Sequence, residues 1–318
     1  MKKKKQDDFI VLLFLFTLAR RTTHDEQSTT NNEQTMSAFN LTVQQLLIPH
    51  DPIIDALKQQ AQAFCLPALP LQEEEYPTEK SKAYWVKLEG EVVAYFVLRT
   101  ELYYGQLTEL YLLPQYFRKE GVEALVNEIR AVALKEKFNY LTVWSSPETN
   151  LIYEQLGGQR SSVWEGEFVA QPATEYYLTV VREPWLDLQT AGLVCWDGDK
   201  LLLAFSKNKQ AWYLPGGKID AGEDSKQALI REIEEELSLC LQPDRLSFLT
   251  PIVAPAFGEK KNIMMQQACY FYPLKNETIT IANEIGGVQY FTKEEYLQHQ
   301  IPVPGVLKVF DFLAESRR

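Results

Sequence analysis

The chain has 318 residues, of which 46% are hydrophobic, and a formal net charge of −11 at pH 7. This length exceeds the usual size of one domain, and the negative charge argues against general binding to a nucleic acid polymer. The four cysteines and three histidines are scattered without metal-ligand spacing, so we expect no zinc site, and free thiols in a reducing, cytoplasmic compartment.

The first 35 residues have the composition of a segment outside the folded domains. Lys2–Lys5 precede an apolar run, Phe9–Ala19, which resembles a secretory signal but is shorter than the ~20 residues that a membrane-spanning helix needs. The polar stretch Thr22–Thr35 predicts disorder. Two interpretations stay open: a leader before a true start at Met36, and a weak membrane tether. In either case we expect no stable membrane insertion.

Helical and strand patterns then alternate up to a break at Arg182–Trp185. We expect one domain over residues 36–183 and a second over 184–318. In the first, apolar spacing predicts a helix over Pro49–Phe64 with Ile53, Leu57 and Ala61 on one face. The other expected elements are a hairpin over Lys82–Arg99 turning at Glu89–Gly90, strands at Leu107–Leu113, Tyr140–Trp144, Val163–Val169 and Tyr176–Val181, and helices at Gly121–Lys137 and Asn150–Leu156.

The second domain is expected to begin with a hairpin, in which Ala191–Trp196 pairs with Leu201–Phe205 around the turn Asp197–Asp199. A glycine-rich turn at Gly216–Gly217, a helix over Ser225–Leu239, several strands and a terminal helix follow. The sequence contains no internal repeat.

The helix over Ser225–Leu239 carries a cluster of carboxylates. Residues three and four apart share a helix face, so we expect Glu232, Glu235 and Glu236 to project together. Leu229, Ile233 and Leu237 form the neighbouring apolar stripe, which we expect to be buried against a sheet. Clustered carboxylates repel one another unless a cation lies among them, and magnesium prefers such oxygen ligands. An acidic chain would need such an ion to hold an anionic substrate. The alternative is a solvated helix face, which most charge runs are.

The spacing of this segment resembles the Nudix box: a glycine, five residues, glutamate, seven residues, Arg-Glu, an aliphatic residue, any residue, Glu-Glu, any residue, glycine and an aliphatic residue. The matching positions are Gly217, Glu223, Arg231, Glu232, Ile233, Glu235, Glu236 and Leu239. Ser238 replaces the final glycine, at the end of the helix. The flanking segments Trp212–Pro215, Glu284–Ile285 and Tyr290–Phe291 look like the MutT-like branch.

The resemblance implies an α/β/α sandwich and attack by water on a diphosphate linkage. It implies that Glu232, Glu235 and Glu236 hold Mg²⁺ or Mn²⁺, with Gly217 as a further candidate ligand. Glu284 lies where some relatives place another carboxylate that binds metal or acts as a base; the alternative is a solvated loop glutamate. Glu223 and Arg231 would pair to orient the loop and the helix.

The substrate is less visible in the sequence. Trp212, Tyr213 and Phe257 are candidates for stacking on a nucleobase, although aromatic residues beside a sheet are more often core. Ala254–Gly258 is a candidate substrate loop. The signature expected of coenzyme A diphosphatases is absent from residues 202–214.

The first domain resembles the GNAT acetyltransferases by weaker motifs. Leu107–Pro114 looks like that family's central strand, and Arg118 and Gly121 match its pyrophosphate-binding turn. Glu123 departs from the pattern, because it adds bulk and negative charge where the family has a small residue. The resemblance implies that Arg118 and Gly121 bind acetyl-CoA at a helix N-terminus and that Tyr153 is a general acid. A packing role for Tyr153 is the alternative.

Together these patterns predict an α/β (α+β) chain: a GNAT-like mixed-sheet domain followed by a Nudix α/β/α sandwich. The expected function is magnesium-dependent hydrolysis of a nucleoside diphosphate linked to another group, by a MutT-like nucleotide pyrophosphohydrolase. Two alternatives remain: an active N-acetyltransferase with an accessory Nudix domain, and a non-catalytic nucleotide sensor. We expect a small nucleotide as the partner, and the oligomeric state stays open.

Overall fold

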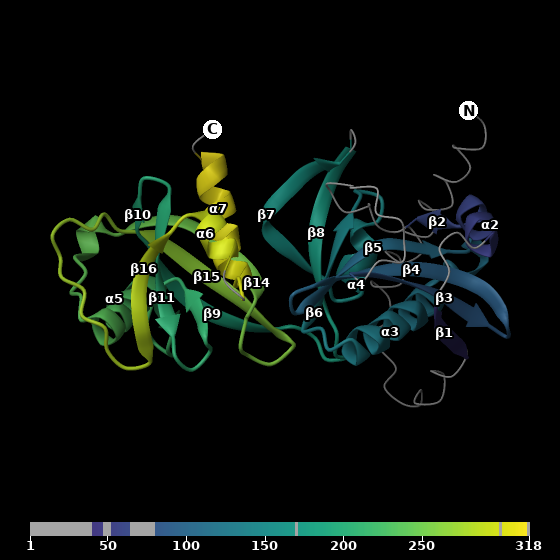
Figure 1. Ribbon diagram of the computed structural model, residues 1–318, viewed down its shortest axis with the longest axis horizontal. Coiled ribbons are helices and arrows are strands. Elements are labelled where there is room, and N and C mark those ends of the chain that lie inside the picture. The colour runs from purple at the N-terminus through teal and green to yellow at the C-terminus, as the bar shows by residue number, and fades with distance from the viewer. Residues whose placement is uncertain (1–39, 47–51, 64–79, 169–170, 299–300, 317–318) are drawn as a thin grey trace, which may run out of the picture. The chain divides into compact units, whose positions relative to one another are not determined.

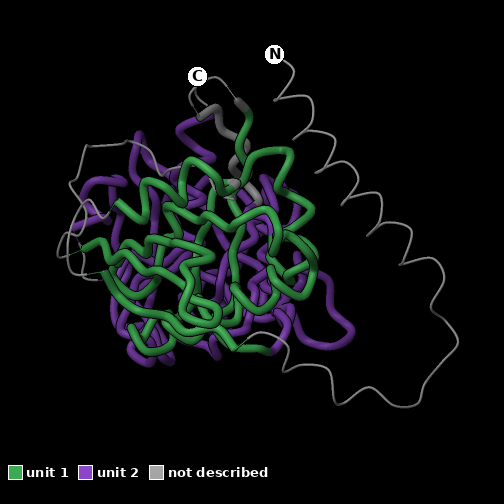
Figure 2. The backbone as a smooth tube through the Cα atoms, turned by 90° about the vertical axis from the view of Figure 1, so that its right-hand side faces the viewer, with its two compact units in different colours: residues 1–159, 165–182 green, residues 160–164, 183–318 purple. Residues whose placement is uncertain are grey.

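The computed structural model describes residues 40–46, 52–63, 80–168, 171–298 and 301–316 (Figure 1). The predicted leader and the choice between Met1 and Met36 lie outside these residues. The chain divides into two compact units, residues 1–159 with 165–182 and residues 160–164 with 183–318 (Figure 2). Within the described part of the chain, no helix has the length and apolar character that crossing a lipid bilayer requires.

The first unit is built on one mixed sheet with the strand order β1-β3-β4-β5-β6-β8-β7, and β2 pairs with β5. The pairs β1-β3, β2-β5, β3-β4, β4-β5 and β6-β8 are antiparallel, and β5 pairs with β6 in parallel. The strands are β1 (Leu41–Gln45), β2 (Gln62–Ala63), β3 (Ser81–Leu88), β4 (Glu91–Glu101), β5 (Tyr104–Leu112), β6 (Tyr140–Ser145), β7 (Gln159–Phe168) and β8 (Gln171–Thr179). The helices are α2 (Pro52–Gln60), η1 (Pro114–Tyr116), α3 (Lys119–Lys135) and α4 (Asn150–Gln155).

The hairpin predicted around Glu89–Gly90 is confirmed. Both turn residues have positive φ angles, 53° and 92°, which is the geometry of a tight turn between twisted strands. The predicted buried face of the first helix was wrong in one position, because Ile54 and Leu57 are buried while Ile53 is 50% exposed. Ile53 and Ile54 are adjacent apolar residues on different faces of a short helix, and packing selects between them.

The second unit contains two four-stranded sheets. In one, β11 pairs with β10, β12 and β16, and the other has the order β13-β9-β15-β14. The strands are β9 (Leu186–Val194), β10 (Trp196–Asp197), β11 (Lys200–Ser206), β12 (Ala211–Tyr213), β13 (Gly216–Lys218), β14 (Ser247–Pro255), β15 (Ile263–Phe271) and β16 (Ile285–Phe291). The helices are α5 (Ser225–Leu237), η2 (Pro243–Arg245), α6 (Lys293–Leu297) and α7 (Pro304–Ser316).

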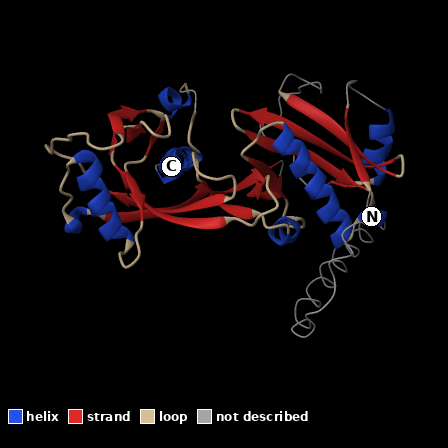
Figure 3. Cartoon of the chain, turned by 90° about the horizontal axis from the view of Figure 1, so that it is seen from below, coloured by secondary structure: helices blue, strands red, loops and turns tan. Residues whose placement is uncertain are grey.

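Figure 3 shows the strands and helices of this unit. Alternating residues of β11 join the cores of two different helices, α5 and α7. Leu202 and Ala204 of β11 join the core that contains α5, whereas Leu201 and Leu203 join the core that contains α7. Because successive strand residues point to opposite faces, the strands form a layer between the two helices. This is the layered α/β arrangement expected for the second domain.

The predicted hairpin of Ala191–Trp196 with Leu201–Phe205 was largely wrong. Only Trp196 and Asp197 form the two-residue strand β10 that pairs with β11, while β9 pairs with β13 and β15 in the other sheet. Ala191 and Leu193 are fully buried against the α5 core and Val194 against the α7 core. A strand that is buried on both faces lies inside a covered sheet, and β9 lies between β13 and β15.

Candidate active site

The turn predicted at Gly216–Gly217 was wrong, because both residues belong to strand β13, which pairs with β9. The two glycines allow this strand to pass close to its neighbours. Gly216 has a φ angle of +130°, and a Cβ there would lie 2.3 Å from the carbonyl oxygen of Ala191. A Cβ at Gly217 would lie 2.3 Å from the carboxylate carbon of Glu232. Only glycine therefore fits at either position without moving β9 or the glutamate.

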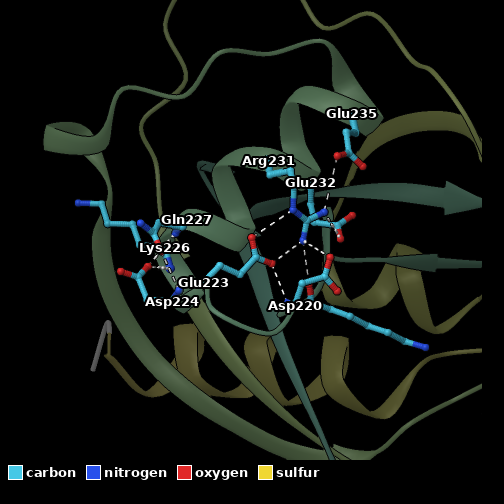
Figure 4. A network of polar contacts seen from close by, with 9 residues as sticks. Asp220, Glu223, Asp224, Lys226, Gln227, Arg231, Glu232 and Glu235 are labelled. Carbon is cyan, nitrogen blue, oxygen red and sulfur yellow. Dashed lines mark hydrogen bonds and ion pairs between the residues drawn. The ribbon is translucent and has the colours of Figure 1, made fainter.

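Arg231 connects α5 to the loop that precedes it (Figure 4). Its guanidinium donates two hydrogen bonds to Glu223, at 2.6 and 3.2 Å, and one to the carbonyl oxygen of Lys218 at 3.2 Å. A further donor lies 2.9 Å from Glu232 Oε1. The hydrogen bond from Arg231 is the main cause that lowers the pKa of Glu223, and the Asp220 amide adds to it. The structure thus brings the predicted pair together and ties both residues to the carboxylate helix.

The ends of α5 are fixed by local backbone chemistry. Asp224 accepts hydrogen bonds from the amides of Lys226 and Gln227, and the Gln227 side chain accepts one from the Asp224 amide, which completes a capping box. At the other end Ser238 adopts the left-handed conformation, with φ 50°. The predicted apolar stripe of Leu229, Ile233 and Leu237 is fully buried, so the carboxylates are presented from an anchored helix.

The carboxylates of α5 differ in environment. Glu236 is 8% exposed, and its Oε2 accepts a hydrogen bond from the Gly216 amide at 3.1 Å. Burial raises the pKa of Glu236 to about 7; the Gly216 amide opposes the shift, and the charges of Glu232, Glu284 and Glu235 add to it. The side chain of Glu232 is 19% exposed and that of Glu235 is 53% exposed. Negative charge is therefore concentrated around Glu236.

A cavity of about 440 Å³ lies beside these groups. Its lining includes the carboxylates of Glu232, Glu236 and Glu284, and the amines of Lys209 and Lys218. Glu235 is not part of the lining, so the three glutamates predicted to act together are not all on the cavity wall. The cavity contains both the anionic groups that attract a metal ion and the cationic groups that attract phosphate.

The two lysines share one counterion in the cavity wall. Glu259 Oε1 lies 3.2 Å from the Lys209 amine and 3.6 Å from the Lys218 amine. Burial raises the pKa of Glu259, but the two lysines outweigh this effect and hold it below its ordinary value. Sequence reasoning missed this cluster, because its members come from three separate segments of the chain that only the tertiary fold brings together.

The aromatic candidates divide into two groups. Tyr213 and Phe257 line the cavity, and the Tyr213 hydroxyl donates a hydrogen bond to the Phe257 carbonyl at 3.2 Å. Trp212 instead packs against Phe205 and Phe291, with ring centroids 5.3 and 4.9 Å apart, and is not part of the lining. The loop predicted at residues 254–258 begins later than expected, because Ala254 and Pro255 belong to β14. Pro255, Ala256 and Phe257 line the cavity.

The chemistry of the donors fits a hard divalent cation, because Glu232, Glu236 and Glu284 offer only oxygen atoms. Crowding of like charges around Glu236 is relieved by a positive ion. Among the described residues, however, no three histidine, cysteine or acidic side chains meet closely enough to enclose a metal. Arg231 holds Glu232 Oε1 at 2.9 Å, so a metal ion at that oxygen would compete with Arg231.

The three acetyl-CoA candidates lie in the first unit. Arg118 precedes α3 with an extended backbone, and Gly121 is in its first turn, where a Cβ would lie 2.2 Å from the Tyr116 carbonyl oxygen. That close approach gives Gly121 a packing role that needs no ligand. Tyr153 is 1% exposed and stacks on Tyr176 with ring centroids 5.8 Å apart, which favours the packing alternative for its role.

Comparison with known proteins finds similarity in the second unit. Residues 187–308 match the family model of the NUDIX domain. Similar solved structures include the E. coli ORF135 protein, with 21% identity over 42% of this chain and 92% of that chain and a TM-score of 0.34. Another is a MutT NUDIX hydrolase from Burkholderia pseudomallei, with 20% identity, 40% and 96% coverage and a TM-score of 0.33. No curated protein matches the chain. Residues 187–308 of the chain are thus similar to the NUDIX domain.

Proposed function

We propose that the second unit hydrolyses a nucleoside diphosphate linked to another group, as a metal-dependent nucleotide pyrophosphohydrolase. The observation that carries this proposal is a single cavity with Glu232, Glu236 and Glu284 in its wall together with Lys209 and Lys218. Carboxylates attract a divalent cation, and lysines bind phosphate directly. Both kinds of group are needed by a substrate that carries adjacent phosphates.

Each group has a role in this proposal. Glu232 and Glu236, with Glu235 after a change of rotamer, are the candidate ligands of Mg²⁺ or Mn²⁺, and Glu284 either joins them or accepts a proton from the attacking water. The bound metal supplies a Lewis acid that draws charge from the bridging phosphates and activates water. Lys209 and Lys218 bind phosphate oxygens in place of Glu259. The hydrogen bonds between Arg231 and Glu223 hold the loop that precedes α5 against this helix.

The direct test is release of phosphate or pyrophosphate by the full chain with Mg²⁺. The panel contains nucleoside triphosphates, dinucleotide polyphosphates and nucleotide sugars. Turnover of one class that a chelator abolishes supports the hydrolase and identifies the substrate. Tight nucleotide binding with no turnover of any class would contradict it and would favour the sensor.

For the first unit we propose a GNAT-like domain. Its mixed sheet supports this proposal, since the parallel pair β5 and β6 is connected through α3. The enclosed position of Tyr153 and the charge of Glu123 argue against acetyl transfer. Titration of the full chain with acetyl-CoA tests this point: weak or absent binding agrees with a non-transferring domain. Near-stoichiometric binding would instead establish acetyl-CoA as a cofactor and favour the acetyltransferase.

A further inference from the structure

A row of three polar residues crosses the sheet beneath the cavity. Thr190 of β9 is paired in register with Lys218 of β13 on one side and with Gln267 of β15 on the other. Side chains paired in register on neighbouring strands project from the same face of a sheet. All three residues line the cavity.

Thr190 and Gln267 are enclosed polar groups that the proposed metal and phosphate chemistry leaves unused. Thr190 is 7% exposed, and its hydroxyl has no hydrogen-bond partner among the residues that the structure describes. Gln267 is 9% exposed, and its carboxamide lies over Gly192, where a Cβ would be 2.8 Å from the amide carbon. An enclosed hydroxyl without a partner is costly in the free protein, and a ligand with a matching polar group removes that cost.

The polar row lies between two different parts of the cavity. Gly192, two residues after Thr190 on β9, is paired with Gly216 of β13, whose amide donates a hydrogen bond to Glu236. Two residues in the other direction, Leu188 is paired with Met265. These two apolar residues line the cavity together with Val306 of α7.

Along β9, from residue 192 to residue 188, the cavity wall therefore changes from acidic to polar and then to apolar. The distance from residue 188 to residue 192 is about 13 Å at the usual rise of a strand. That length matches a nucleotide placed along β9, in which phosphate, sugar and base follow one another covalently. With the phosphates at the carboxylates, the sugar falls beside Thr190 and Gln267, and the base reaches Leu188 and Met265.

We propose that Thr190 and Gln267 bind the ribose hydroxyls of the substrate and so select ribonucleotides over 2′-deoxyribonucleotides. This inference rests on the proposed function, because it takes the orientation of the substrate from the carboxylate end. A hydroxyl and a carboxamide together supply the donors and acceptors that a vicinal diol requires. A deoxyribose leaves one of these enclosed groups without a partner, which is the condition under which a site discriminates strongly.

The test compares each ribonucleotide with its 2′-deoxy counterpart in the wild-type chain and in Thr190→Val, which keeps the shape and removes the hydroxyl. We expect wild-type kcat/KM to favour the ribonucleotide by about tenfold or more, as one hydrogen bond of ordinary strength implies, and Thr190→Val to bring the ratio close to one. Thr190→Ser should restore the preference. Gln267→Leu should reduce it in the same direction.

Matched controls separate this effect from a general loss of fold. Thr250→Val changes a threonine of β14 outside the cavity lining, and Gln266→Leu changes the residue next to Gln267 on the opposite face of β15. Both controls should keep the wild-type preference. A wild-type ratio near one, or a Thr190→Val variant that alters discrimination among bases and not between sugars, overturns the inference.

Binding measurements give a readout that does not depend on turnover. Calorimetric titration with AMP, GMP, CMP and UMP and their 2′-deoxy forms should show the same preference in the wild type and its loss in Thr190→Val. An inactive chain that still prefers the ribose form would contradict the proposed hydrolysis and support the sugar site. An active chain without the preference would support the proposed hydrolysis and contradict the sugar site.

Discussion

Two neighbouring glutamates of α5 differ in what they contact. Glu236 is 8% exposed and lines the cavity, while Glu234 is exposed and does not. We expect Glu236→Gln, and the predicted ligand variant Glu235→Gln, to lower kcat by about 100-fold or more, because a metal ligand loses its charge. Steady-state hydrolysis with thermal unfolding measures both effects. Glu234→Gln is the matched control and should keep wild-type turnover; full activity of Glu236→Gln would remove the metal assignment.

Ser238 occupies the left-handed position at the end of α5, where the family pattern has glycine. A residue with a Cβ is strained in this conformation by about 1–2 kcal/mol. Glycine removes the strain, but it also increases the conformational freedom of the unfolded chain, which offsets part of the stabilisation. We expect Ser238→Gly to raise the free energy of unfolding by about 1 kcal/mol, seen as a rise of a few degrees in Tm. Ser238→Ala keeps the strain and should show no rise. Equal Tm values for the glycine and alanine variants would contradict this explanation.

At the scale of the element, strand β13 sets the position of Glu232. A Cβ at Gly217 would collide with that carboxylate, so we expect Gly217→Ala to displace it and to lower kcat/KM by about 10- to 100-fold. Hydrolysis as a function of Mg²⁺ concentration measures the change. Gly287→Ala is the control, because a Cβ there lies 3.4 Å from Trp212, an ordinary contact. An unchanged Mg²⁺ dependence in Gly217→Ala would show that Glu232 is not a ligand.

The loop after β15 is held by Glu277. The Lys275 amide and Arg245 donate hydrogen bonds to this carboxylate, both at 2.6 Å, and in that order they lower its pKa to about 2. A depressed pKa in the folded state stabilises the fold above the unfolded pKa and ceases to do so as pH falls. We expect Glu277→Gln to lower Tm at pH 7 and the difference from wild type to shrink between about pH 4.5 and pH 2. A Tm difference that is constant with pH would contradict this.

How far the sequence predicts each element depends on where its partners lie. The buried stripe of α5 followed from local spacing and is confirmed by the full burial of Leu229 and Ile233. The pairing of β9 was mispredicted, because its partner β15 lies far along the chain. For the same reason Thr190 and Gln267 gave no signal in the sequence. The residues that match the Nudix box could be predicted from the sequence because they all lie within residues 217–239.

At the scale of the whole molecule, the length predicted two cores, and the chain divides into two compact units. The family match covers residues 187–308 and so concerns the second unit. The expected boundary between residues 183 and 184 stays a prediction. Among the residues that carried the acetyltransferase resemblance of the first unit, Gly121 and Tyr153 have a burial that packing explains, whereas Arg118 is exposed.

The measurement that tests the central claim most directly is hydrolysis of the preferred nucleotide by the full chain in oxygen-18 water, with Mg²⁺ and with a chelator. We predict that Mg²⁺ supports turnover and that one phosphorus-containing product gains a single oxygen-18 atom per cleavage, because water attacks phosphorus. The chelator should abolish both the turnover and the incorporation of oxygen-18. Turnover that persists in the chelator, or products without the label, would contradict a metal-dependent hydrolase at this cavity.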